Sequence, residues 1–254
     1  MSERLFWAIM AASVASTIIL STMVFIVNVP VEGQPNDEGM PEIISLNFNQ
    51  DEFEFEIKAD DAIIHNDSDF VRQFYSSLST SRFVVSDSVI DALMDVLDEK
   101  IEKMSDLEKA KALLEFVYVN IMYKSDDRQF GYSEYIQYPS ETLLHKKGDC
   151  EDMASLLYIL YEKAGLDAVL IHCDNHVAVG VDTDAYGKTV TFRGKEYTIS
   201  DPTSSLGLGN TALEGIWFVD KADNPFATNL ILVEIVAVQL FIGFVIFTQW
   251  RLNN

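Results

Sequence analysis

The chain is poor in cysteine and in positive charge. Its two cysteines, Cys150 and Cys173, are too few for a disulfide framework. Only 18 lysines and arginines stand against 40 aspartates and glutamates, which gives a formal net charge of −22 at pH 7. Nucleic-acid binding depends on cationic contacts to phosphate, so we expect no nucleic-acid partner. The acidity is compatible with a salty medium, with cationic substrates, or simply with solubility.

Two long stretches, one near each end, contain almost no charge. Leu5 to Val29 has no charged side chain, and a helix of that length, at about 1.5 Å per residue, crosses the roughly 30 Å hydrocarbon layer of a bilayer. Leu230 to Trp250 contains one charged residue, Glu234. We therefore expect transmembrane helices over residues 1–29 and 229–250. A cleaved signal peptide is the alternative for the first stretch, and a buried amphipathic helix is the alternative for the second.

The flanking charges suggest an orientation in the membrane. Arg4 and Arg251 lie just outside the two stretches, and the positive-inside rule puts both on the cytoplasmic side. Both termini are then cytoplasmic. Residues 30–41, rich in Pro, Gly, Asn and acids, are expected to be a linker, and residues 42–228 an extracytoplasmic domain. The expected location is the cell membrane, with two spans.

Apolar periodicity in this domain predicts helices followed by strands. Phe53, Phe55 and Ile57 alternate with polar residues, which is typical of a half-buried strand. Helices are predicted over residues 69–79, 87–103, 106–123, around 139–142 and over 151–164, with a capping box at Ser105 and Glu108. Strands are predicted over 168–171, 176–181, 189–192 and 197–200. The predicted fold class is α+β, a helical layer packed on an antiparallel sheet.

Cys150 lies at the start of the helix that ends near Ala164. The backbone N–H groups and the dipole at a helix start favour negative charge, so we expect the position to lower the pKa of this thiol. The carboxylates of Glu151 and Asp152 act against a thiolate, so a base is still needed.

A histidine from another element is the natural base for this thiol. His176 begins a predicted strand just after a turn, and Asp201 follows the next hairpin, where it can accept from the imidazole N–H. His172 is the competing base, although it lies in the middle of a probable core strand. Asp201 precedes Pro202, so its alternative role is that of a turn former.

The combined motifs resemble the transglutaminase-like superfamily over about residues 105–205. They are Tyr138-Pro139-Ser140-Glu141-Thr142-Leu143, Lys147-Gly148-Asp149-Cys150-Glu151-Asp152, the histidine strand and Asp201-Pro202-Thr203. The resemblance implies a papain-like α+β core shared with transglutaminases, cysteine peptidases, peptide N-glycanases and membrane-tethered prokaryotic proteins. It implies that Cys150 is the nucleophile, His176 the base and Asp201 the orienting acid. The family's oxyanion-stabilising side chain has no clear match, and Tyr118, Asn120 and Gln137 are the candidates.

The expected function is acyl transfer on a protein or peptide substrate. Cys150 attacks a peptide or glutamine amide, and the resulting thioester passes to water or to an amine, with hydrolysis preferred. We expect no cofactor and no metal. A zinc site of Cys150, His172, Cys173 and His176 is disfavoured, because adjacent strand residues point to opposite faces. A Cys150–Cys173 disulfide would switch the enzyme off until reduced. The alternative function is a catalytically silent binding or scaffold module.

Overall fold

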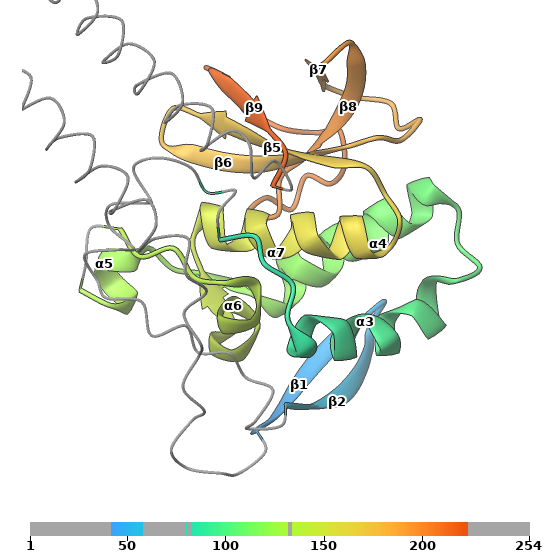
Figure 1. The fold of residues 1–254 in the computed structure, drawn as a ribbon, viewed down its shortest axis with the longest axis vertical. Helices are drawn as coiled ribbons and strands as arrows, with labels where there is room; N and C mark the ends of the chain where they lie inside the picture. The colour runs from blue at the N-terminus through green and yellow to red at the C-terminus, as the bar shows by residue number, and fades with distance from the viewer. Residues whose placement is uncertain (1–41, 58–79, 81–82, 132–133, 223–254) are drawn as a thin grey trace, which may run out of the picture. The chain divides into compact units, whose positions relative to one another are not determined.

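The computed structural model describes residues 42–57, 80, 83–131 and 134–222 (Figure 1). Its elements, in chain order, are β1 (Glu42–Phe48), β2 (Asp51–Ile57), α3 (Ser88–Ile101), α4 (Asp106–Asn120), β3 (Met122–Tyr123), α5 (Asp126–Gln129), α6 (Pro139–His145), β4 (Lys147–Gly148), α7 (Cys150–Lys163), β5 (Ala168–Cys173), β6 (His176–Val181), β7 (Thr189–Phe192), β8 (Lys195–Ser200) and β9 (Phe218–Asp220). The predicted α+β class is confirmed. The helix predicted over 69–79 lies outside the described residues.

The N-terminal hairpin joins β1 and β2 through a two-residue turn. Asn49 and Gln50 both have positive φ, the backbone of a turn whose twist suits a hairpin. Phe55 and Ile57 are buried on one face of β2, while Glu56 between them is exposed. The strand predicted here is therefore confirmed. Its partner β1 was not predicted.

The two long helices α4 and α7 pack against each other, as the apolar stripe of α4 predicts. The capping box at the start of α4 is confirmed, with the Ser105 N–H donating to Glu108 Oε2 at 2.8 Å. Tyr161 of α7 donates its hydroxyl to the carbonyl of Ala110 on α4 at 3.0 Å. α4 ends at Asn120 rather than at residue 123, because the next residues form the strand β3.

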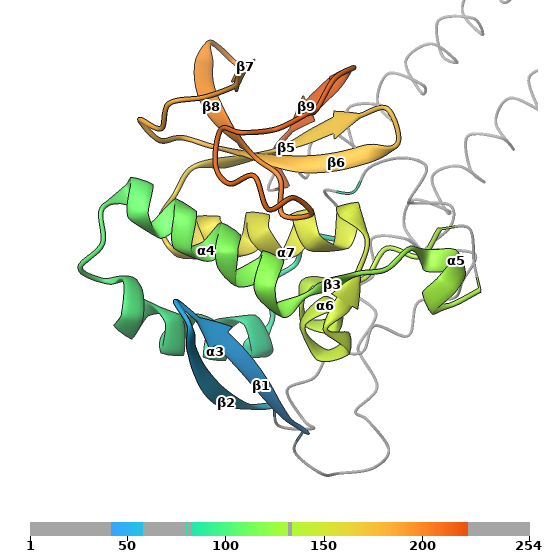
Figure 2. The ribbon, with the colours of Figure 1, turned by 180° about the vertical axis from the view of Figure 1, so that it is seen from behind.

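A five-stranded antiparallel sheet lies over the face of α7 opposite α3, in the order β7-β8-β6-β5-β9 (Figures 1 and 2). Alternate residues of its strands face opposite sides. One side contributes Leu170, Val179 and Val181 to the main core with α7. The other side carries a second, smaller cluster, formed by Val169, Ile171, Cys173, Tyr197 and Ile199. The predicted arrangement of a helical layer on an antiparallel sheet is confirmed.

Both predicted membrane spans, over 1–29 and 229–250, lie outside the described residues, as does the linker at 30–41. Within the described ranges, no helix has the length and apolar character that a bilayer crossing requires.

Candidate active site

Cys150 is held at the start of α7 by a short parallel pairing of β3 with β4. Tyr123 is in register with Gly148, and the Lys124 N–H donates to the Gly148 carbonyl at 2.8 Å. A Cβ at position 148 would lie 2.6 Å from the Cβ of Asp152, so the close approach requires glycine here. The segment before the nucleophile is thereby fixed against the end of α4.

Buried carboxylate contacts also fix the first turn of α7. Asp152 is fully buried and accepts from the Gln137 N–H at 2.7 Å and from the Gln137 side-chain amide at 2.6 Å. The same carboxylate accepts from the N–H of Asp149, the N-cap residue, at 3.3 Å. Gln137 also donates to the Lys147 carbonyl at 3.0 Å and contacts the His145 ring. These bonds explain why an amide and an acid are buried beside the cysteine.

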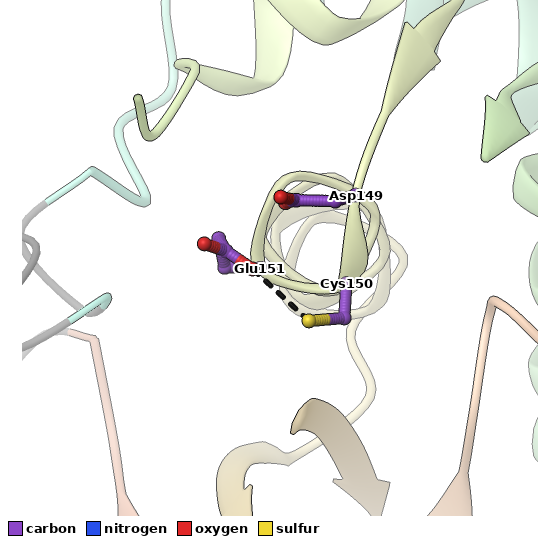
Figure 3. A group of neighbouring side chains, drawn as sticks. All are labelled: Asp149, Cys150 and Glu151. Carbon is purple, nitrogen blue, oxygen red and sulfur yellow. Dashed lines mark hydrogen bonds between the residues drawn. The ribbon is translucent and has the colours of Figure 1, made fainter. Parts of the chain in front are cut away.

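The Cys150 thiol is buried, and it donates to Glu151 Oε2 at 3.0 Å (Figure 3). Burial raises the pKa of the Cys150 thiol far above its usual range, and the charges of Glu151 and Asp149 raise it further. A hydrogen bond from the Val177 backbone N–H acts in the opposite direction but is outweighed. The prediction of a lowered thiol pKa is therefore wrong. Desolvation and two neighbouring carboxylates exceed the effect of the helix start.

His176 and Asp201 are brought together by neighbouring strands. β6 pairs antiparallel with β8, and Val179 lies opposite Ser200, so Asp201 reaches the first residues of β6. His176 Nε2 lies 3.3 Å from Asp201 Oδ2, an ion-pair distance at which the ring N–H is not aligned for a hydrogen bond.

The Asp201 carboxylate is fixed and charged. Its Oδ1 accepts from the Thr203 N–H at 3.0 Å and from the Thr203 hydroxyl at 2.7 Å. Burial raises the pKa of Asp201, but the contacts with His176 and Thr203 outweigh burial and leave that pKa below its usual value. Asp201 is thus a stable anionic partner for an imidazole.

Cys150 and His176 approach each other through the backbone. The Val177 N–H that meets the Cys150 sulfur belongs to the residue directly after His176. Among the described residues, no hydrogen bond joins the sulfur to either nitrogen of the His176 ring. Contacts between a catalytic thiol and its base are often loose without substrate and tighten when substrate binds.

His172, the competing base, lies deeper in the sheet. It is 7% exposed, and its Nε2 is buried without a hydrogen-bond partner in the described part of the chain. Burial lowers the pKa of His172, while the charges of Asp220 and Glu151 oppose that shift. His172 pairs with Val177 across the strands, so its side chain shares the α7 side of the sheet.

The three oxyanion candidates occupy different places. Tyr118 is exposed on α4. Asn120 donates to the carbonyls of Asn47 and Phe116, both at 2.8 Å. Gln137 holds Asp152, as described above.

Tyr123 is a site residue that the sequence analysis missed. Burial raises the pKa of the Tyr123 hydroxyl, and the next causes are the charges of Cys150 and Asp149. Tyr123 is 55% exposed, and its strand pairs with Gly148, two residues before Cys150. Its position follows from the β3–β4 pairing, and the sequence analysis had placed this tyrosine as the last residue of the helix predicted over 106–123.

Several carboxylates lie close to Cys150. Three groups have ligand atoms within 4.8 Å of one another and could hold a metal ion, namely Asp149 with Cys150 and Glu151, Asp126 with Glu134 and Glu151, and Asp126 with Asp149 and Asp152. Burial, together with neighbouring acids, raises the pKa of Asp126 to about 7 and that of Asp149 to about 11. The expectation of no metal stays a prediction.

Cys173 lies away from this cluster. It belongs to the small apolar cluster on the other side of the sheet, with Ile171 and Ile199. Both cysteines are free thiols. No metal-capable group in the described residues combines the two cysteines with His172 and His176.

Comparison with known proteins gives a family match and distant structural likenesses. The model of the transglutaminase-like superfamily matches residues 96–193, which include Cys150 and His176. No curated protein sequence matches the chain. LapG from Legionella pneumophila, in an EGTA-treated form, is 17% identical with a TM-score of 0.40, covering 60% of this chain and 84% of LapG. A candidate cysteine protease from Cytophaga hutchinsonii is 14% identical with a TM-score of 0.35, covering 69% of this chain and 67% of that protein.

The family assignment rests on the sequence match rather than on these structural likenesses. The matched segment begins in α3 and ends just after β7, so it spans the helical layer, the cysteine helix and the histidine strand. Asp201 lies outside this match, directly after the end of β8. Residues 96–193 therefore form a transglutaminase-like domain.

Proposed function

We propose that this protein is a cysteine peptidase or amidase that works through a thioester. The observation that carries the proposal is the pairing of His176 with Asp201 at 3.3 Å, at the end of the sheet where the Val177 N–H meets the Cys150 sulfur. Acyl transfer by cysteine requires three groups. They are a thiol at a helix start, an imidazole on a facing strand, and a carboxylate that contacts the imidazole from behind.

The roles of the histidine nitrogens follow from the geometry. Because Nε2 of His176 faces Asp201, Nδ1 is the nitrogen left for the thiol. In the first step, the Cys150 sulfur attacks the substrate carbonyl carbon while His176 takes the thiol proton. The amide C–N bond then breaks, the amine leaves with the proton from His176, and a thioester remains on Cys150.

Water completes the reaction. His176 takes a proton from the attacking water, the C–S bond breaks, and the carboxylic acid leaves as the thiol is re-formed. Asp201 keeps the imidazole oriented and stabilises its protonated form. With a raised thiol pKa, the resting site holds a neutral cysteine, so the base acts during attack rather than in a preformed ion pair.

Two donors serve the developing oxyanion. The backbone N–H of Cys150 opens α7 and has no partner inside the helix, as is general for the first helical residues. The Tyr123 hydroxyl is the proposed side-chain donor, because its strand pairs with Gly148, two residues before Cys150. Together they replace the oxyanion residue that the sequence left unassigned.

The proposed enzyme is anchored in the membrane. The support is the uncharged run from Leu5 to Val29 and the apolar run from Leu230 to Trp250, with Arg4 and Arg251 on the cytoplasmic side. Carbonate-washed membranes should retain the full chain, and protease added outside intact cells should cleave the domain. Release of the full chain by carbonate would refute the anchor.

Protein hydrolysis tests the enzymatic proposal. The full chain in detergent micelles should release dye from fluorescein-labelled casein, and Cys150→Ala and His176→Ala should each abolish release. Incorporation of dansylcadaverine into casein without release would assign amine transfer instead of hydrolysis. Tyr186→Ala, at a fully exposed tyrosine, is the control and should leave the rate unchanged.

One observation favours a second candidate function. The raised pKa of Cys150 and its bond to Glu151 keep the sulfur protonated, as expected of a catalytically silent module that binds partners through its acidic surface. In that case neither casein hydrolysis nor dansylcadaverine incorporation would depend on Cys150.

A further inference from the structure

An exposed aromatic pair lies at the edge of the sheet. The rings of Trp217 and Phe218 stack with centroids 6.1 Å apart, and the two residues are 67% and 44% exposed. Phe218 begins the edge strand β9, and the Trp217 N–H donates to the His172 carbonyl at 3.1 Å. Exposed aromatic faces of this size are common where a protein binds a partner.

His172 lies beneath this pair with an unused nitrogen. Its ring centroid is 5.8 Å from that of Trp217 and 5.5 Å from that of Phe218. The side chain is 93% buried, and Nε2 has no hydrogen-bond partner in the described structure. Leaving such a buried polar atom unsatisfied is destabilising, so a ligand group that reaches it is favoured.

Acidic side chains also act on His172. The charges of Asp220 and Glu151 both act on His172, and the Glu151 carboxylate accepts from the Cys150 thiol. His172 lies opposite Val177, the residue whose N–H meets the sulfur. In the part of the chain that the structure describes, no lysine or arginine forms an ion pair with Glu151. His172 therefore joins the aromatic pair to the strand that meets the Cys150 sulfur, and the Glu151 carboxylate bound to that thiol has no cationic partner among the described residues.

We propose that Trp217, Phe218, His172 and Glu151 form a subsite for an arginine side chain of the substrate. The guanidinium would stack on the Trp217 face and donate N–H bonds to the Glu151 carboxylate and to the His172 nitrogen. Arginine fits better than lysine because its plane can stack and its several N–H groups point in fixed directions. The inference rests on the proposed function, in which the substrate is a peptide, and it names the class of peptide.

Binding to an inactive variant tests the subsite apart from catalysis. The full chain carrying Cys150→Ala, in detergent micelles with EDTA, is titrated by calorimetry with the blocked peptide acetyl-Ala-Ala-Arg-Ala-Ala-amide. The same peptide with citrulline, lysine or leucine at the centre serves for comparison. We expect the arginine peptide to bind about tenfold tighter than the citrulline peptide, which has nearly the same shape without the charge.

Two variants should remove this preference while keeping the fold. Trp217→Ala and Glu151→Gln each change a side chain that is not fully buried, and each should reduce the ratio of arginine to citrulline affinity to about threefold or less. Tyr186→Ala, at a fully exposed aromatic, and Glu196→Gln, at an exposed acid on β8, are the matched controls and should leave the ratio unchanged.

Equal affinity for the arginine and citrulline peptides would overturn the subsite, as would tighter binding of the leucine peptide. A preference that disappears when millimolar calcium or magnesium replaces EDTA would assign the carboxylates to a metal ion and would overturn it too. Casein hydrolysis without arginine preference would refute the subsite alone. Arginine preference in a chain that hydrolyses nothing would refute the peptidase alone.

Discussion

His176 Nε2 and Asp201 Oδ2 lie 3.3 Å apart, although 24 residues separate them in the chain. The contact exists because β6 and β8 run antiparallel side by side, which brings the start of one strand to the end of the other. Thr203 holds the carboxylate with two hydrogen bonds. An imidazole held in this way presents its other nitrogen in a fixed direction, as a general base must.

Asp201→Asn should lower the activity without unfolding the protein, because Asp201 acts on the orientation and charge of the His176 ring. The amide keeps the size of the carboxylate but loses the charge that stabilises protonated His176, so kcat/KM for casein should fall by about a hundredfold or more. Thermal unfolding followed by circular dichroism checks that the fold persists. Thr203→Val, which removes one of the two bonds from Thr203, should cost less. An Asn variant with undiminished activity would remove Asp201 from the mechanism.

Stability should depend on pH through Asp126. Its carboxyl keeps a proton in the folded state up to a pKa of about 7, whereas the unfolded chain releases that proton near 3.8. Between these values the folded state binds more protons, so the contribution of Asp126 to stability falls as the pH rises from about 4 to 7.

Asp126→Asn should therefore raise the melting temperature at pH 8 and change it much less at pH 4. The asparagine carbonyl can still accept from the Tyr135 N–H, which contacts Asp126 in the structure. Differential scanning calorimetry with EDTA present measures both values. A variant that melts earlier at pH 8, or that shifts equally at the two pH values, contradicts the assigned protonation.

Glu151→Gln should make Cys150 more reactive. Glu151 raises the pKa of the thiol both through its charge and by accepting the thiol hydrogen bond, so its neutralisation should lower that pKa. Iodoacetamide should label Cys150 severalfold faster at pH 7 in the variant than in the parent, as quantified by peptide mass spectrometry. Glu196→Gln, at an exposed acid, is the control. Slower labelling in Glu151→Gln would mean that the carboxylate activates the thiol.

Tyr123→Phe tests the proposed oxyanion donor. Loss of the hydroxyl should lower kcat by about ten- to a thousandfold with little change in KM, since the bond forms in the transition state. Tyr118→Phe provides the comparison, because Tyr118 is an exposed tyrosine on α4 and should leave kcat unchanged. An equal effect of both substitutions would leave Tyr123 without a special role.

Much of the fold could be predicted from local patterns. The capping box of Ser105 and Glu108, the helix after Cys150 and the alternation of β2 each depend on residues a few positions apart. Hairpin neighbours such as β5 and β6 are also close in sequence. These signals were enough to place Cys150 at a helix start and His176 at the start of a strand.

The parts that could not be predicted depend on pairings between distant segments. β3 has two residues and no period of its own, so Tyr123 joins the site only through its partner Gly148. β9 has only three residues, and its place beside β5 is what brings Trp217 close to His172. The sign of the Cys150 pKa shift depends on how deeply the thiol is buried, which no local pattern reports.

Acylation of Cys150 tests the central claim most directly. The full chain is mixed with p-nitrophenyl acetate, quenched at successive times and mapped by mass spectrometry. We predict one acetyl group on Cys150 that hydroxylamine removes, forming about a hundredfold more slowly in His176→Ala. Acetylation of Cys173, or acetylation of Cys150 at equal rates in both chains, would contradict the account.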